Sequence, residues 1–372
     1  VTTLPLVIPE TPTNLDTQFV FSPQSYYSSH LIKVIDALND AQESVDIAMY
    51  SFSDASVRNA VADAVARGIT VRMLLENGRA DVNSPEGSPS AIFEDLGVDV
   101  RYINKIMHHK FAIIDGPQDV DDEPEDALLI TGSGNWSYGA ASKYDENTSF
   151  IKGHSRLVQS FQKQFNFIWQ NSRDFVWSEA VEYFETMPIE MSSELSIETD
   201  GVEVAYTSDN FRTYNSSRYG KTFSVVAGRN TIANHVVELI ESAQTSIRIA
   251  SGHMRSRPIA EAITAKKQAN PEMDIRVYLD NQEYVSISKH WQQVAKLNTC
   301  LIKAGASESK TQKCYDSGFY FAYEFQLEEI NMKFKYYAFR WDYSYALQMH
   351  HKYIIIDDNT VASGSYNFSD NA

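Results

Sequence analysis

The side chains with the clearest chemical potential form a short pattern that occurs twice in this chain. The spacing His-x-Lys-x4-Asp is formed by His108, Lys110 and Asp115, and again by His350, Lys352 and Asp357. A Gly-Ser-x-Asn segment follows each copy and supplies Ser133 with Asn135 and Ser365 with Asn367. Because both copies carry the same companion segment, the pattern is far more specific than a single match.

Two His, two Lys and two Asn side chains around one point would suit a phosphodiester. Lys and Asn donate hydrogen bonds to phosphoryl oxygens as negative charge builds on them, and we expect the Ser side chains to support this phosphate site. A neutral His can attack phosphorus, and a protonated His can donate to the leaving oxygen and then activate water. Because two Lys supply positive charge, the pattern predicts catalysis without a metal ion or other cofactor.

Strand geometry indicates which motif side chains share a face. Phe111–Ile114 and Tyr353–Ile356 are strand-like, and side chains alternate between the two faces of a strand. The His and Lys of each motif therefore point the same way. Asp115 and Asp357 lie an odd number of residues from the motif His, so we predict that they brace the motif without touching the phosphate.

The two patterns belong to two copies of a larger unit. The same order of similar segments pairs 41–48 with 243–250, 69–75 with 273–279, and 107–110 with 349–352. The offset grows from 202 to 204 to 242 residues, which indicates a long insertion before the second motif. Apolar residues in each copy alternate between helical spacing and strand-like runs, so we predict an α/β fold with a mixed or parallel sheet covered on both faces.

We expect four segments along the chain. They are an extended arm at 1–17, a first repeat at 18–170, a helix and linker at 171–203, and a second repeat at 204–372. The acidic stretch 119–126 is expected to be a solvated loop, with a calcium site as the less favoured alternative.

These residues resemble the phospholipase D superfamily, which is defined by paired HKD motifs, from about residue 19 onward. The resemblance implies two tandem α/β/α lobes related by a pseudo-twofold axis, with one active site at their interface. It also implies that His108 is the nucleophile, that His350 is the general acid and that Glu146 orients His108. From spacing alone, Glu146 could equally be a polar loop residue.

The second copy departs from the first after its motif. The first copy continues through a strand and a helix to Gln170, whereas the second ends at Ala372, five residues after Asn367. About thirty residues expected from the repeat, including a counterpart of Glu146, are absent from the second copy. A clipped chain and a partner chain that supplies the piece are both compatible with this pattern.

An insertion at 300–345 in the second copy is rich in aromatic residues and cations. Such residues can stack bases, enclose a choline headgroup or contact a lipid interface. The alternative is an antiparallel hairpin whose aromatic residues fill a core. Trp341 in this insertion, together with His253 and Arg255 after a strand of the second copy, is a candidate substrate contact, although His253 could also be structural.

Composition bounds the substrate and the compartment. Lys plus Arg is 32 and Asp plus Glu is 49, so the net charge of −17 opposes non-specific capture of a polyanion. A local cationic cleft can still bind one, because distant charges are screened. Cys300 and Cys314 fit either a disulfide or two free thiols. The chain begins at Val1, not Met, and we expect a secreted or periplasmic protein.

Phosphodiester cleavage through a phosphohistidine is the predicted reaction. Nucleic acid is the preferred substrate, because Phe21-Ser22-Pro23 and the segment 47–52 resemble the small endonuclease branch of the superfamily. A phospholipase D that hydrolyses phosphatidylcholine-type lipids, or transfers them to alcohols, is the alternative. A non-catalytic phosphate-binding or nucleic-acid-binding protein is the third reading. One chain suffices for one site, because the repeat supplies both motifs.

Overall fold

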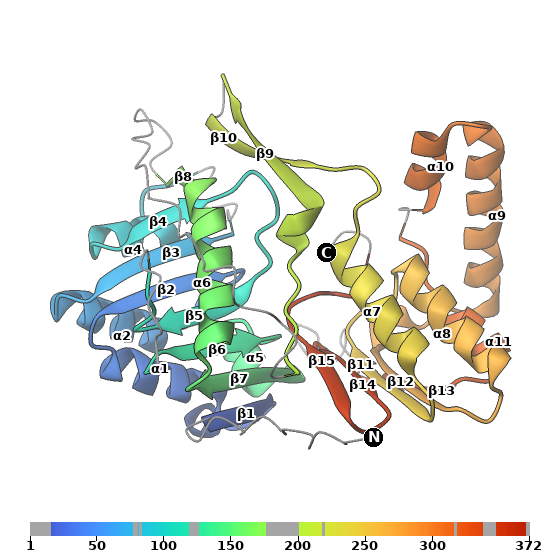
Figure 1. The fold of residues 1–372 in the computed structure, drawn as a ribbon, viewed down its shortest axis with the longest axis horizontal. Helices are drawn as coiled ribbons and strands as arrows, with labels where there is room; N and C mark the ends of the chain where they lie inside the picture. Colours follow the sequence, from blue (N-terminus) through green and yellow to red (C-terminus); the bar gives the residue numbers. More distant parts are fainter. Residues whose placement is uncertain are drawn as a thin grey trace, which may run out of the picture.

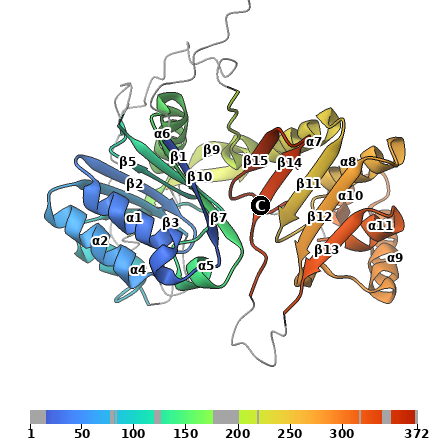
Figure 2. The same ribbon diagram turned by 90° about the horizontal axis from the view of Figure 1, so that it is seen from below.

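The protein forms two lobes, each built on a mixed sheet with helices packed against it (Figures 1 and 2). The computed structural model describes residues 16–76, 81, 84–118, 126–175, 201–217, 220–315, 318–337 and 347–369. The α/β fold with two tandem lobes is confirmed. Among these residues, no helix has both the length and the apolar character needed to cross a bilayer.

The first lobe contains an eight-stranded sheet in the order β1-β7-β6-β5-β2-β3-β4-β8. β2, β3 and β4 are parallel, and the other neighbours pair antiparallel. The strands are β1 (Asp16–Ser22), β2 (Ser44–Met49), β3 (Thr70–Leu75), β4 (Asp99–Tyr102), β5 (Lys110–Ile114), β6 (Leu128–Gly132), β7 (Glu146–Lys152) and β8 (Arg173–Asp174).

Helices cover both faces of this sheet. α1 (His30–Asp40) and α2 (Ala55–Ala66) bury apolar side chains against one face, and α6 (Ser155–Gln170) covers the other with Phe165 and Trp169. Asp54 begins α2 by accepting hydrogen bonds from two backbone N–H groups of its first turn. Short helices η1 (Tyr26–Ser28), α4 (Pro89–Asp95) and α5 (Tyr138–Ser142) complete the lobe.

The second lobe repeats the central part of this arrangement. Its sheet has the order β13-β12-β11-β14-β15, with β11 parallel to β12 and antiparallel to β14, as β2 is to β3 and β5. The strands are β11 (Ser246–Ser251), β12 (Asp274–Asp280), β13 (Asn331–Lys335), β14 (Lys352–Ile356) and β15 (Thr360–Ser363). α7 (Thr231–Ser242) and α8 (Arg257–Ala269) correspond to α1 and α2.

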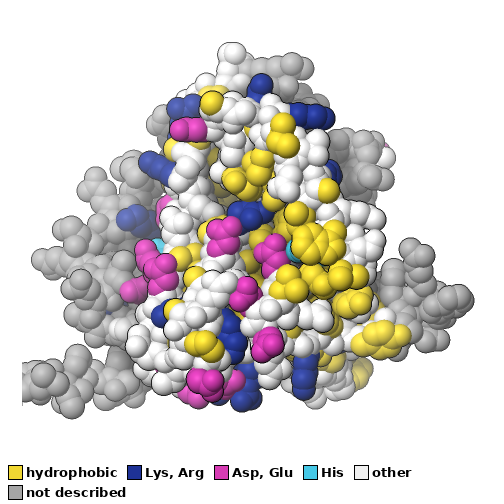
Figure 3. Space-filling view, turned by 90° about the vertical axis from the view of Figure 1, so that its right-hand side faces the viewer, with side chains coloured by type: hydrophobic (Ala, Val, Ile, Leu, Met, Phe, Trp, Pro, Cys, Tyr) yellow, Lys and Arg dark blue, Asp and Glu magenta, His cyan; other side chains and the backbone are white. Residues whose placement is uncertain are grey.

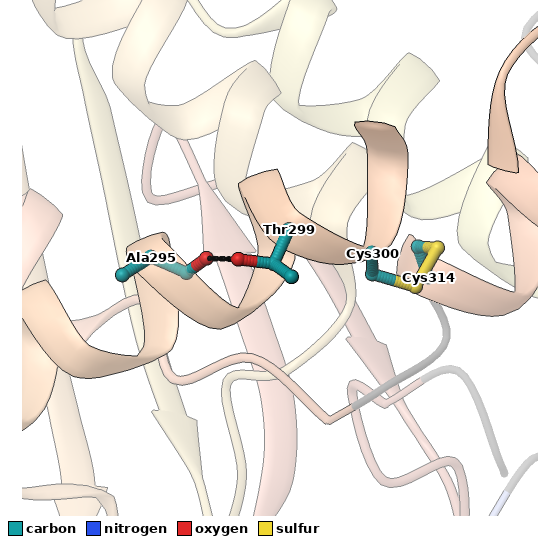
Figure 4. Close-up of a disulfide and its surroundings, with 4 residues drawn as sticks. All are labelled: Ala295, Thr299, Cys300 and Cys314. Atoms are coloured by element: carbon teal, nitrogen blue, oxygen red, sulfur yellow. Dashed lines mark hydrogen bonds between the residues drawn. A yellow bond between two sulfur atoms is a disulfide. The ribbon is translucent and has the colours of Figure 1, made fainter. Parts of the chain in front are cut away.

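The described part of the aromatic insertion contains helices and one parallel strand, so the antiparallel hairpin considered as the alternative is not found there. It contains the end of α9 (Ile287–Ala304), α10 (Glu308–Tyr315) and α11 (Ala322–Leu327), after which β13 pairs parallel with β12. A disulfide joins Cys300 of α9 to Cys314 of α10 (Figure 4). The buried aromatic residues fill the core from loop and helix positions, namely Phe319, Phe321 and Phe325. Trp341 lies outside the described residues.

The outer side of the second lobe exposes large apolar side chains. Figure 3 looks onto this side and shows hydrophobic groups gathered on one part of it. The exposed groups on α9, α11 and the adjoining segments are Tyr284, Ile287, Trp291, Ile302, Leu327 and Tyr336. Part of the aromatic insertion and its surroundings therefore faces solvent.

The expected segment boundaries differ from the observed elements at two places. Asp16 and Thr17, assigned to the arm, already belong to β1 and pair with β7. The hairpin of β9 (Phe211–Ser216) and β10 (Gly220–Val225), assigned to the second repeat, packs on the first lobe: the rings of Phe223 and Phe167 lie 5.7 Å apart. The η3 turn (Thr207–Asn210) precedes this hairpin. The acidic residues 119–125 and the linker residues 176–200 lie outside the described residues.

Candidate active site

The two motifs meet where the lobes touch. β5 and β14 each begin at the motif Lys, so the motif His lies two residues ahead of its strand. Asp145, just before β7 in the first lobe, donates to the carbonyl of Gln348 and accepts from the N–H of His350, both at 2.9 Å. This backbone contact places the start of β7 beside the second motif.

His108 is held by residues of the second lobe. Its Nδ1 lies 3.1 Å from the carbonyl oxygen of Ser365, and its Nε2 lies 3.5 Å from Nδ2 of Asn367. An Nδ1–H that donates to this carbonyl leaves the Nε2 lone pair available for attack. Burial, followed by the charges of Lys110 and Lys352, lowers the pKa of His108 to about 2. The imidazole is therefore neutral at physiological pH.

Glu146 contacts the histidine of the opposite lobe. Its Oε1 lies 2.6 Å from Nδ1 of His350, and the Glu146 side chain is fully buried. The expectation that Glu146 orients His108 is therefore wrong, because β7 directs this carboxylate across the lobe boundary. Burial raises the pKa of Glu146 to about 7, while burial and neighbouring Lys charges lower that of His350. Both shifts favour the uncharged form of each partner, so the proton of this pair is held on Glu146 while no anion is bound.

Lys110 and Lys352 are buried cations for which the described residues provide no ion-pair partner. Nζ of Lys110 lies 3.3 and 3.2 Å from the two ring nitrogens of His108 and 3.0 Å from its carbonyl oxygen. Nζ of Lys352 donates to the carbonyl of His350 at 2.6 Å. Burial lowers the pKa of both, to about 8 for Lys352. An anion bound between these ammonium groups would supply the counter-charge that they lack.

Asp115 and Asp357 lie at the far ends of the motif strands. The carboxylate of Asp115 accepts hydrogen bonds of 2.8 to 3.2 Å from the backbone N–H groups of residues 42–44. Asp357 accepts equivalent bonds of 2.7 to 2.9 Å from residues 244–246. Both carboxylates thus fasten β5 or β14 to the segment that begins the neighbouring strand, which fits a bracing role.

The four Ser and Asn side chains are not equivalent. Ser133 is fully buried, and its hydroxyl accepts from the N–H of Asn147 at 2.9 Å and hydrogen-bonds to Glu146, so it supports the site from behind. Ser365 contacts His108 through its carbonyl. The side-chain oxygens of Asn135 and Asn367 are buried without a hydrogen-bond partner in the described structure. Each of these two Asn side chains therefore has an amide oxygen left to accept a hydrogen bond from a ligand.

A cavity of about 1220 Å³ adjoins this centre and is lined by both lobes. The polar groups on its wall from the motifs and the following loops are His108, Lys110, Lys352, Ser365 and Asn367. Apolar side chains also line the cavity, among them Phe19, Ile103, Phe161, Val236 and Leu239. The cavity can therefore receive a ligand that combines a phosphate with a bulky or apolar portion.

Residues 34–169 and 236–372 match the family described as "Cardiolipin synthase, PLD-like domain", so both motif-bearing repeats are included. The chain belongs to the phospholipase D superfamily. It is similar to the mitochondrial cardiolipin hydrolases of Chlamydomonas reinhardtii (31% identical over 147 residues, 39% of this chain and 60% of that protein) and Xenopus tropicalis (30% over 150 residues, 40% and 65%). The chain thus spans less than two thirds of the length of these relatives.

Two solved structures are also similar to parts of the chain. Nuc from Salmonella typhimurium, a phospholipase D family member, is 25% identical with a TM-score of 0.37, covering 43% of this chain and 98% of that one. Polyphosphate kinase from Porphyromonas gingivalis is 12% identical with a TM-score of 0.45, covering 72% and 38%.

Two residues near this phospholipase D-like centre were missed by the sequence analysis. The ring of Tyr50 lies 4.5 Å from that of His108, and Nζ of Lys110 lies 4.9 Å from the Tyr50 ring centroid. His30 is buried, and its Nε2 lies 3.0 Å from the carbonyl oxygen of Asn135. Tyr50 directly follows β2, a position from which a side chain can enter the site, whereas His30 opens a helix and gave no such signal.

The histidines that follow the motif histidines serve the surrounding structure. Nε2 of His109 lies 3.4 Å from Nε2 of Gln164, and Nδ1 of His351 lies 3.2 Å from Oδ1 of Asn147. Within the described residues, the one cluster of at least three potential metal ligands is formed by Glu94, Asp99 and Asp174. None of the motif residues belongs to that acidic cluster.

Proposed function

We propose that this phospholipase D superfamily member is a hydrolase that cleaves phosphodiesters through a covalent phosphohistidine on His108. The observation that carries the proposal is the exchange of partners between the lobes: Ser365 and Asn367 hold His108, and Glu146 holds His350. This arrangement supports different protonation states for two otherwise similar histidines.

In the first step, Nε2 of His108 attacks phosphorus, and the bond from phosphorus to the leaving oxygen breaks. Lys110, Lys352 and the Asn amides stabilise the charge on the non-bridging oxygens. The proton of the Glu146–His350 pair moves to His350 as the phosphate anion arrives, and His350 gives it to the leaving oxygen. The product alcohol departs, and the phosphoryl group remains on His108.

In the second step, His350 is neutral and removes a proton from a water molecule. The resulting hydroxide attacks phosphorus, and the bond from phosphorus to Nε2 of His108 breaks. This returns both histidines to their starting states, so atoms and protons balance over the cycle. Two buried ammonium groups provide the positive charge in both steps, so the mechanism does not require a metal ion.

Nucleic acid and phospholipid are the two substrate classes that we carry forward. Nucleic acid is favoured by the likeness of the 47–52 segment to the endonuclease branch. Phospholipid is favoured by the apolar side chains that line the cavity and by the cardiolipin hydrolases among the similar proteins. The disulfide between α9 and α10 supports a secreted or periplasmic location, where such bonds persist.

The test compares hydrolysis of bis(4-nitrophenyl) phosphate, plasmid DNA, RNA and phospholipid vesicles, each with and without EDTA. We expect turnover that EDTA does not reduce, and a phosphorylated His108 trapped by acid quenching. A His108→Ala variant with unchanged turnover would remove His108 from the nucleophile role. Absence of both turnover and trapped phosphohistidine would instead favour a binding protein.

A further inference from the structure

The loop after β11 carries side chains that the equivalent loop of the first lobe lacks. In each lobe, two successive backbone N–H groups of this loop donate to one carbonyl, that of Trp136 in the first lobe and that of Phe368 in the second. The two loops therefore follow the same path. This equivalence places Arg255 where the first lobe has Ser53, and His253 lies two residues earlier.

A second difference is a missing side chain beside this loop. The N–H of Tyr50 donates to the carbonyl of His109, and the N–H of Gly252 donates to that of His351, so Tyr50 and Gly252 are equivalent. Tyr50 packs against the first motif histidine, whereas Gly252 has no side chain to do so. A Cβ at Gly252 would lie 2.8 Å from the carbonyl oxygen of Met349, so only glycine fits without a shift.

Glu283, from the η4 turn (Asn281–Glu283), holds His253 and Arg255 in place. Its Oε1 lies 3.0 Å from Nδ1 of His253 and accepts from Nε and Nη2 of Arg255 at 2.9 and 2.7 Å. Glu283 is 1% exposed. Burial by itself raises its pKa, but the hydrogen bonds from His253 and Arg255 outweigh burial and bring the pKa below its ordinary value. The carboxylate is therefore ionised and fixes both partners.

Each of these side chains retains a polar group for a ligand. Nη1 of Arg255 and Nε2 of His253 have no hydrogen-bond partner within the described structure, and both residues line the cavity beside the catalytic centre. The Arg255 guanidinium also lies 4.4 Å from the ring centroid of Tyr320, which fixes its plane.

We propose that His253 and Arg255 form a subsite for a second phosphate of the substrate, next to the phosphodiester that is cleaved. This inference rests on the proposed function. The ligand chemistry is a second phosphodiester close to the scissile one. Such a group is present in an oligonucleotide of three or more residues and in a lipid with two phosphates, but not in a dinucleotide or a single-phosphate lipid.

The experiment measures kcat/KM for two matched substrate pairs. One pair is the dinucleotide dTpdT and the trinucleotide dTpdTpdT, and the other is phosphatidylglycerol and cardiolipin in the same vesicles. We define the preference as kcat/KM for the two-phosphate substrate divided by that for its one-phosphate partner. Loss of a charge-assisted hydrogen bond in Arg255→Gln should reduce this preference roughly 10- to 100-fold. The pair that shows the loss identifies the source of the second phosphate.

Arg276→Gln is the matched control, because Arg276 is exposed, pairs with Asp274 and does not line the cavity. The preference of this variant should stay within about twofold of that of the unmodified protein. If Arg255→Gln melts early because Glu283 loses its partner, the double variant Arg255→Gln with Glu283→Gln removes both charges together. Calorimetric binding of dTpdTpdT and of soluble short-chain cardiolipin to His108→Ala protein supplies a readout that does not need turnover.

An unchanged preference in both substrate pairs, or unchanged binding of both ligands when Arg255 is altered, overturns the subsite. Failure of the proposed function would be a separate result, because the unmodified protein would then not hydrolyse bis(4-nitrophenyl) phosphate.

Discussion

The contact between Glu146 and His350 allows the proposed acid–base chemistry to be tested at one atom pair. Glu146→Gln keeps the shape of the side chain and can still accept from Nδ1, but it removes the negative charge. The neutral amide can no longer stabilise the imidazolium that protonates the leaving group. We therefore expect kcat to fall while substrate binding changes little.

The magnitude follows from the geometry. The Oε1 to Nδ1 distance is 2.6 Å and the carboxylate is fully buried, so solvent does not screen the contact. A hydrogen bond to a charged group contributes about 1.5 to 3 kcal/mol, and each 1.36 kcal/mol in the barrier is tenfold in rate. We expect kcat to fall roughly 10- to 150-fold.

The assay is hydrolysis of bis(4-nitrophenyl) phosphate between pH 5 and 9. Glu94→Gln is the matched control, because it makes the same chemical change at another carboxylate whose pKa burial raises to about 7, away from the motifs. That control should leave kcat unchanged. A Glu146→Gln variant with the kcat and pH profile of the unmodified protein would refute the assignment of His350 as the acid.

Three further changes test other parts of the molecule. Asp115→Ala should lower the free energy of unfolding by about 1 to 3 kcal/mol through loss of the bonds to residues 42–44, as measured by urea titration. Activity should fall as pH rises through about 8, because Lys352 loses the charge that stabilises phosphate. In a Lys352→Arg variant the fall in rate near pH 8 should disappear from the pH–rate profile, even if turnover is low. Cys300→Ala with Cys314→Ala should destabilise α9 and α10 by about 3 kcal/mol in calorimetry, with hydrolysis of bis(4-nitrophenyl) phosphate within about twofold.

The repeat and its motif residues could be predicted because their signals are local. The His-x-Lys spacing on a strand fixes a common face, and the parity of Asp115 and Asp357 predicts their opposite placement. The partner of Glu146 could not be predicted, since it depends on how β7 of one lobe docks against the other. The carbonyl of Ser365 was missed for the same reason, because every residue offers a carbonyl and its role exists only in three dimensions.

The insertion shows a different limit of sequence reasoning. Its aromatic residues predict burial, and Phe319, Phe321 and Phe325 are buried, but their spacing does not separate a hairpin from short helices and loops. The disulfide between Cys300 and Cys314 depends on the antiparallel approach of α9 and α10. Glu283 was overlooked because it carries no motif, and its importance comes from the two cationic side chains that it fastens.

The reciprocal exchange of Glu146, Ser365 and Asn367 between the lobes has a consequence for dissecting this protein. A fragment with only the first lobe would retain an imidazole that can attack but no group to protonate the departing alcohol. A fragment with only the second lobe would retain His350 but would lack the carboxylate of Glu146. Turnover from the two pieces mixed in one tube would therefore report their reassembly, and the chain could serve as a split reporter of proximity.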